Sequence, residues 1–207
     1  MPIAAALASF KAGVTQCDSL IVNAHQQDAN GPHLLPEIDR RQITVAAFLN
    51  MFREWESFLE AAMAALLSGA TTINGIAPAK IASPASPADA RIMVKGINRY
   101  FDYGNHQLFR KIAEIYFVNG GPFQPHINAI NGDLDDLRTM RHASAHMSST
   151  TQSSLDTLAL RLLGRPSIGI DLYDLLTAAD PQSAAGETIY QRHRDILVAT
   201  AELIANG

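Results

Sequence analysis

Apolar residues recur at intervals of three and four along nearly the whole chain, and no stretch alternates apolar and polar residues long enough to predict a strand. This spacing gives each segment one apolar helical face, which must be buried against another helix. Of the 207 residues, 47% are apolar and 17% are charged, a composition that provides a core and excludes general disorder. The sequence therefore predicts an all-α helical bundle of about six to eight helices in a single domain.

Turn residues divide the chain into its expected helices. Asn30-Gly31-Pro32 ends the first helix, and Ser68-Gly69 ends the second. Residues 70–87 form an expected long internal loop, because their prolines and Gly75 do not propagate a helix. The expected helices cover about residues 3–28, 40–67, 87–102, 105–118, 131–146, 153–163, 169–179 and 185–205.

Composition also limits the expected compartment and partners. The apolar N-terminus lacks a basic leader and no apolar run is long enough to span a bilayer, so we expect a cytoplasmic protein without membrane contact. A single cysteine, Cys17, excludes an internal disulfide and a cysteine-rich metal site. The net charge of −4 argues against nucleic-acid binding over the whole surface and leaves room for a local basic site.

The most unusual local feature is a predicted helix that carries two arginines and two histidines, Leu137–His146. Arg138, His142 and His146 follow one another at four-residue spacing and share a stripe, and Arg141 lies beside it. Histidine exchanges a proton near neutral pH, and arginine binds phosphate through paired donors. Together these side chains have the chemistry to frame a phosphodiester.

This segment resembles the signature of the HEPN superfamily, an Arg followed by a polar residue and then a His about five positions after the Arg. In this chain the three positions are occupied by Arg141, His142 and His146. The family commonly has Asn at the position of His142. Trp55-Glu56-Ser57-Phe58-Leu59-Glu60 is similar to the apolar-Glu-x-aromatic pattern of RiboL-PSP and related bacterial HEPN families. The resemblance in helix order covers about residues 40–165.

The resemblance implies a metal-independent endoribonuclease without a cofactor. In such an enzyme the ribose 2′-OH attacks the neighbouring phosphate and leaves 2′,3′-cyclic phosphate and 5′-OH ends. Arg141 would stabilise charge on phosphorus, and His146 and His142 would move protons. Arg138, which shares their stripe, is a possible supporting residue, and Glu56 is either a residue that orients Arg141 or a catalytic His by an ion pair or an ordinary surface Glu. HEPN proteins resemble composite enzymes, in which two chains together form the active site. The resemblance therefore implies a homodimer, and the reaction implies RNA as the partner.

A second basic feature is a short track on an expected helix. Arg91, Lys95 and Arg99 follow one another at four-residue intervals, which would align them for successive RNA phosphates. The alternative is an ordinary solvated helix face.

Two other functions fit the same residues. His142 and His146 have the i, i+4 spacing of two metal ligands, although a third ligand such as His106 or His126 requires a tertiary contact, and Arg138 would repel a cation. The chain also fits a non-catalytic helical module that binds RNA, a nucleotide or a protein. Its protein partner would be a cognate antitoxin or regulatory protein in a toxin–antitoxin or phage-defence pair.

Overall fold

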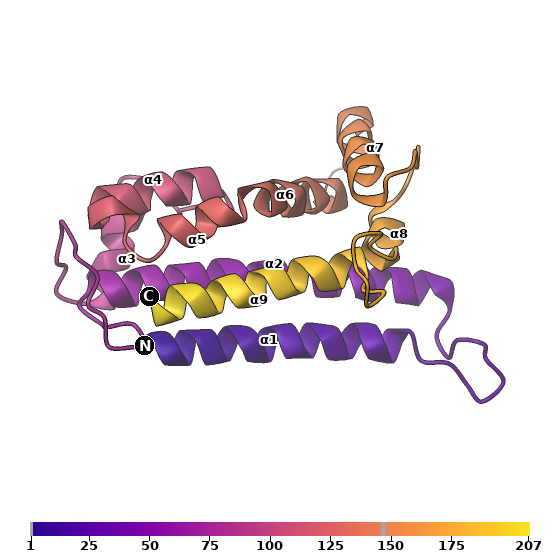
Figure 1. Cartoon of the computed structure of the whole chain (residues 1–207), viewed down its shortest axis with the longest axis horizontal. Helices are drawn as coiled ribbons and strands as arrows, with labels where there is room; N and C mark the ends of the chain where they lie inside the picture. The colour runs from indigo at the N-terminus through magenta and orange to yellow at the C-terminus, as the bar shows by residue number, and fades with distance from the viewer. Residues whose placement is uncertain (1, 146–147) are drawn as a thin grey trace. The chain divides into compact units, whose positions relative to one another are not determined.

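The computed structural model describes residues 2–145 and 148–207, and these residues form nine α-helices, one 3₁₀ helix and no β-strand (Figure 1). This result confirms the all-α prediction. The elements are α1 Ile3–Ala24, α2 Glu37–Leu67, α3 Pro87–Lys95, α4 His106–Tyr116, η1 Val118–Gly120, α5 Gln124–Ala129, α6 Asn131–Ala145, α7 Ser149–Leu163, α8 Leu172–Thr177 and α9 Ile189–Asn206.

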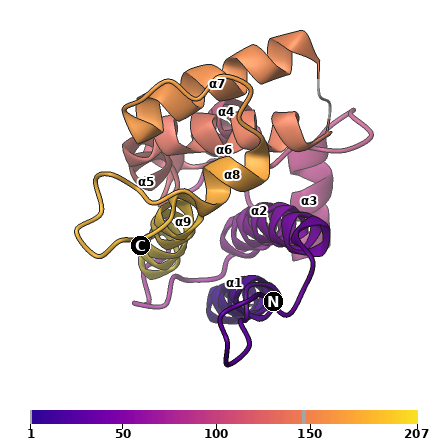
Figure 2. The same cartoon turned by 90° about the vertical axis from the view of Figure 1, so that its right-hand side faces the viewer.

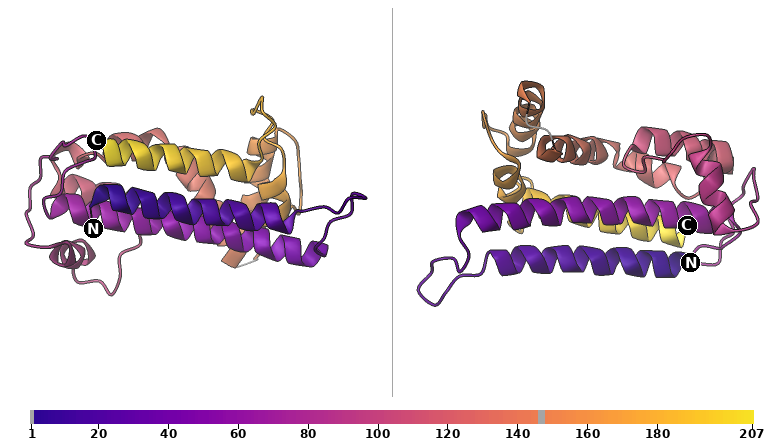
Figure 3. Two further views of the ribbon diagram at one scale, coloured as in Figure 1. Left: turned by 90° about the horizontal axis from the view of Figure 1, so that it is seen from below. Right: turned by 180° about the vertical axis from the view of Figure 1, so that it is seen from behind.

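The chain divides into two compact units, and neither is a continuous stretch of sequence. The first comprises Met1–Ala12, Arg53–Asn131 and Ile196–Gly207, and the second comprises Gly13–Phe52 and Gly132–Asp195. Figure 3 shows the long helices α1, α2 and α9. Each of them contributes one part to each unit. The sequence contains no linker that indicates this division, because the boundaries fall inside helices or directly after a helix begins.

Three aromatic rings from α1 and α2 form the core of the first unit. The ring of Phe10 lies 6.0 Å from that of Trp55 and 5.6 Å from that of Phe58, and all three side chains are buried. Lys11 of α1 forms an ion pair with Glu202 of α9 at the edge of this core. The aromatic side chains Trp55 and Phe58 of α2 are therefore buried against Phe10 of α1.

The shorter helices of the first unit are held by a second aromatic cluster. Phe123 lies 5.3 Å from Phe109 of α4 and 5.6 Å from Phe117, ring centre to ring centre. The connection between Leu67 and Pro87 contains no helix, as its prolines and glycine predict, and Lys80 pairs with Phe117 in an isolated β-bridge. The short helix α5, which lies between α4 and α6 in the chain, was not predicted.

The second unit contains α6, α7 and α8 together with parts of the three long helices (Figure 2). Buried leucines lie along α6 and α7, and Asp18 of α1 accepts hydrogen bonds from Tyr190 (3.1 Å) and Arg194 (3.3 Å) of α9. Arg41 of α2 forms ion pairs with Asp171 and Asp174 at the N-terminus of α8. Acidic residues are stable at that end of a helix because of its positive dipole.

Several helix ends differ from the predicted ones. The first helix ends at Ala24 instead of residue 28, and the antiparallel bridge between Gln27 and His33 follows it. The helix that begins at Pro87 ends at Lys95 instead of residue 102. Gly96 has a φ of 57°, and a residue with this backbone angle cannot be part of a right-handed helix.

Replacing one of the three aromatic rings in the first unit should lower the stability of the protein. Phe58 is 2% exposed, so Phe58→Ala should lower the free energy of unfolding by about 3–5 kcal/mol, measured by urea denaturation. Ile97→Ala is the matched control, because Ile97 is fully exposed and its replacement should change stability by less than about 0.5 kcal/mol. Equal effects of the two substitutions would contradict the placement of Phe58 in the core.

His25 in the second unit should make stability depend on pH. Burial, followed by the nearby charges of Arg40 and His33, holds the pKa of His25 below its ordinary value of 6.5. The unfolded chain then binds the proton more readily, so this contribution is present above pH 6.5 and is lost as the pH falls towards the folded pKa. His25→Gln should therefore flatten the decline in unfolding free energy below pH 6.5. Urea denaturation at a series of pH values measures this slope, and an unchanged slope would contradict the prediction.

Candidate functional site

Two helices of the second unit, α6 and α7, line a surface groove of about 390 Å³. Its α6 wall carries a carboxylate, a guanidinium, an imidazole and a hydroxyl, and its α7 wall carries three hydroxyls. The lining residues are Asp135, Arg138, Thr139 and His142 from α6 and Thr150, Thr151 and Ser154 from α7. A larger groove of about 480 Å³ in the first unit is lined by no titratable side chain, so of these two grooves the α6–α7 groove is the better candidate for chemistry.

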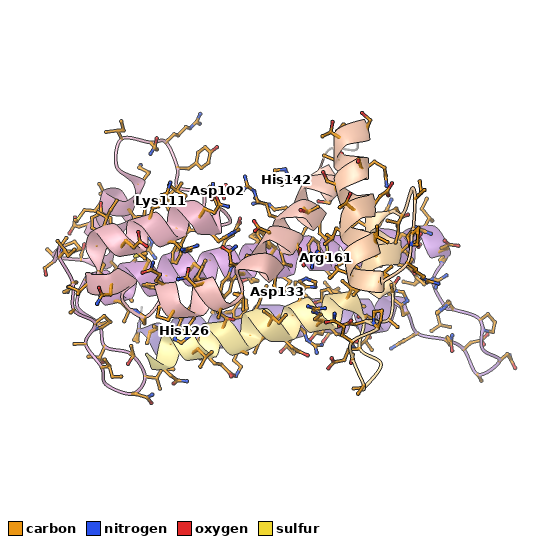
Figure 4. The ribbon with its side chains drawn as sticks, turned by 45° about the horizontal axis from the view of Figure 1, so that its top comes forward. Asp102, Lys111, His126, Asp133, His142 and Arg161 are labelled. Carbon is orange, nitrogen blue, oxygen red and sulfur yellow. The ribbon has the colours of Figure 1, made fainter. Side chains whose placement is uncertain are left out.

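Helix periodicity explains which α6 side chains reach the groove. Arg138 and His142 stand four residues apart and lie on one face of α6, as their spacing predicts, and Figure 4 labels His142 on that helix. His142 is exposed and Arg138 is half-buried. Among the residues that the structure describes, neither side chain forms a hydrogen bond or an ion pair. Their donors are therefore available to a ligand.

The α7 wall begins at a well-defined helix N-terminus. The hydroxyl of Ser148 accepts a hydrogen bond from the Thr151 backbone N–H (3.2 Å), and the Thr151 hydroxyl accepts one from the Ser148 N–H (2.8 Å). This capping box starts the helix at Ser149, four residues earlier than predicted. It brings the hydroxyls of Thr150 and Thr151, and the positive end of the helix dipole, to the groove.

Arg141 lies on another face of α6. Its guanidinium carbon is 5.1 Å from the centre of the Phe52 ring of α2, the geometry of a cation–π contact, and it does not line the groove. Arg141 was predicted to lie beside the stripe of Arg138 and His142 and to stabilise charge on phosphorus, but its side chain contacts α2. The predicted catalytic His146 lies outside the described residues.

The remaining predicted residues belong to the first unit. Glu56 is half-buried on α2. Arg91 forms an ion pair with Glu60, with 2.6 Å between Nε and Oε1. The prediction that Arg91, Lys95 and Arg99 share one helix is wrong for Arg99, because α3 ends at Lys95 and Gly96 turns the chain away. The structure therefore does not contain the predicted three-residue basic track.

A buried ionic cluster in the second unit was not predicted. Asp136 of α6 is 5% exposed and accepts a hydrogen bond from Arg161 of α7. Its second carboxylate oxygen, Oδ2, lies 3.8 Å from Nε2 of His193 in α9. Arg192 lies 3.6 Å from a carboxylate oxygen of Asp133. Figure 4 labels Asp133 and Arg161 of this cluster.

One feature of the amino-acid sequence could have indicated that Asp136 is buried. Asp136 stands four residues before the buried Met140, so it falls on the apolar face of α6, where a carboxylate is unusual. Burial raises the pKa of Asp136, but the adjacent His193 ring, and the hydrogen bond and charge of Arg161, outweigh burial and leave the pKa below its ordinary value. Asp136 is therefore a carboxylate at neutral pH.

Comparisons with protein-family models, with curated proteins and with solved structures each find no match to this chain. In the part of the chain that the structure describes, no helix combines the length and the apolar character needed to cross a bilayer.

The stabilising effect of the Ser148 cap on α7 can be tested by substitution. Ser148→Ala removes the cap of α7 and should lower the free energy of unfolding by about 1 kcal/mol. Ser153→Ala is the matched control within α7, where alanine favours the helix and stability should be equal or higher. Urea denaturation of both variants checks this, and a Ser148→Ala variant as stable as the parent would contradict the cap.

Proposed function

We propose that this chain is an HEPN-like, metal-independent endoribonuclease whose phosphodiester site is the α6–α7 groove. The observation that carries the proposal is that Arg138 and His142 line one groove with the α7 hydroxyls and form no ion pair with any described residue. A charged guanidinium and an imidazole are donors that bind a phosphate. The hydroxyls of Thr139, Thr151 and Ser154 in the groove donate to backbone carbonyls of their own helices. Asp135 in the same groove can accept a hydrogen bond from a ribose 2′-OH.

The proposed reaction needs proton transfer and charge stabilisation but no metal. The 2′-oxygen forms a bond to phosphorus as its proton passes to a general base, and the bond from phosphorus to the 5′-oxygen breaks as a general acid protonates that oxygen. The products are a 2′,3′-cyclic phosphate and a 5′-OH. His142 and His146, four residues apart in the sequence, are the proposed acid and base.

The groove and the resemblance favour different arginines for stabilising charge on phosphorus. The resemblance assigns this role to Arg141, which in the structure stacks on Phe52. The groove favours Arg138, which lines it together with His142. We propose Arg138 as the phosphate-binding residue and Arg141 as the residue that fixes α6 against α2 within the second unit.

The resemblance further supports a homodimer in which each chain supplies one copy of the Arg and His residues. We propose a toxin–antitoxin or phage-defence setting in the cytoplasm, with a cognate antitoxin or regulatory protein as partner. The second candidate, a non-catalytic RNA-binding module, uses the same donors in the groove.

Cleavage of a labelled single-stranded RNA in the presence of EDTA tests the proposal. The parent chain should produce cyclic phosphate ends, and its specific activity should fall on dilution as the dimer dissociates. His142→Ala and His146→Ala should each lower the cleavage rate by about 10²-fold or more. Arg138→Ala should lower it by about 10²-fold, and Lys111→Ala, an exposed residue of the first unit, should not change it.

Three other outcomes of the cleavage assay would change or overturn the proposal. A larger loss in Arg141→Ala than in Arg138→Ala would return the phosphate-binding role to Arg141. RNA binding without cleavage, weakened in Arg138→Ala, would replace the nuclease by a binding module. Cleavage that requires added metal, or that survives both histidine substitutions, would overturn the proposal.

A further inference from the structure

We propose that Asp133, Asp136 and His193 form a divalent transition-metal site, with Zn²⁺ as the expected ion, that links α6 to α9 within the second unit. One potential ligand atom from each residue lies within 4.8 Å of the other two. Asp136 and His193 are buried and Asp133 is half-buried. None of the three residues lines the α6–α7 groove, so this site is separate from the proposed nuclease site.

The His193 ring is oriented as a metal ligand. Its Nδ1 lies 2.8 Å from the backbone oxygen of Ile189, so a proton on Nδ1 donates to this carbonyl and leaves the lone pair of the neutral ring on Nε2. Metal-binding histidines usually donate their other ring N–H to a carbonyl or carboxylate in this way.

The Nε2 atom of His193 has no hydrogen-bond partner in the structure, although the residue is only 1% exposed. The nearest carboxylate oxygen, Oδ2 of Asp136, is 3.8 Å away, which is beyond hydrogen-bond distance. An unsatisfied ring nitrogen in a protein interior is destabilising. A cation between Nε2 and Oδ2 would satisfy both atoms.

The carboxylates keep oxygens available for a cation. Arg161 donates to Oδ1 of Asp136, which leaves Oδ2 facing His193. Arg192 forms an ion pair with Oδ1 of Asp133 at 3.6 Å, without a direct hydrogen bond. A carboxylate whose second oxygen is held by a hydrogen bond is the usual arrangement around a bound metal.

The donor set identifies the class of metal. One imidazole nitrogen and two carboxylate oxygens are ligands of Zn²⁺ and other first-row divalent ions, and three protein ligands leave one position for water. Bonds of about 2.0 Å in a tetrahedral site place ligand atoms about 3.3 Å apart. The 3.8 Å between Asp136 and His193 therefore needs to close by about 0.5 Å, and the Asp133 oxygen, which lies within 4.8 Å of the other two ligand atoms, by up to about 1.5 Å. Rotation of the half-buried Asp133 side chain can supply this movement.

Titration of the chelator-stripped, dialysed full chain with ZnCl₂, followed by calorimetry and by metal analysis, tests this site. We expect about one tightly bound zinc per chain and a rise in the unfolding temperature on binding. Asp133→Asn changes a half-buried ligand and should weaken zinc binding by about 10-fold or more without unfolding the chain. His193→Ala should abolish binding, and the matched control His126→Ala, a histidine of the first unit, should leave it unchanged.

Co²⁺ provides an independent readout, because a four-coordinate site gives intense visible absorption that Asp133→Asn should remove. The absence of zinc binding by the stripped parent chain would overturn the proposal in favour of a direct ion pair between protonated His193 and Asp136. Binding that persists in a folded Asp133→Asn, Asp136→Asn double variant would also overturn it. The RNA cleavage assay is run in EDTA, so failure of one proposal leaves the other unaffected.

Discussion

The Asp136 carboxylate lies in the interior of the second unit, where a negative charge is stable only when it is paired. Arg161 of α7 supplies a charged donor to one of its oxygens, and His193 of α9 lies beside the other. These partners come from helices on two sides of α6, so they fix the rotation of α6 about its own axis. A rotation that removed Asp136 from these groups would leave a buried charge without a partner.

The rotation of α6 decides what each of its other side chains does. With Asp136 turned inward, Leu137 and Met140 pack in the core, and Arg138 and His142 line the groove with α7. Arg141 is one residue before His142, which on a helix places it on a different face. It therefore contacts Phe52 of α2 instead of the groove. The proposed reassignment of the phosphate-binding role from Arg141 to Arg138 follows from this geometry.

The two proposals use different faces of the same helix for different purposes. The groove face would bind a phosphodiester and move protons, which are tasks for an exposed histidine and an available guanidinium. The inner face would hold a metal ion that links α6 to α9 and takes no part in cleavage. A stable inner face keeps the groove residues in place, because catalytic side chains act efficiently only when their supporting helix is rigid.

Apolar spacing, proline and capping residues act over a few positions, so the all-α class and the approximate position of most helices could be predicted from the amino-acid sequence. It also determined that Arg138 and His142 share a helix face. It did not reveal the end of α3 at Gly96, which separates Arg99 from Lys95, because glycine is often tolerated inside a helical pattern.

Only the tertiary structure decided which side chains meet across helices. Arg161 and His193 follow Asp136 by 25 and 57 residues, and no local pattern indicates that they converge on its carboxylate. The contact between Arg141 and Phe52 likewise joins positions far apart in the sequence. Such pairings depend on how whole helices pack and rotate, and that is set by the burial of many side chains together.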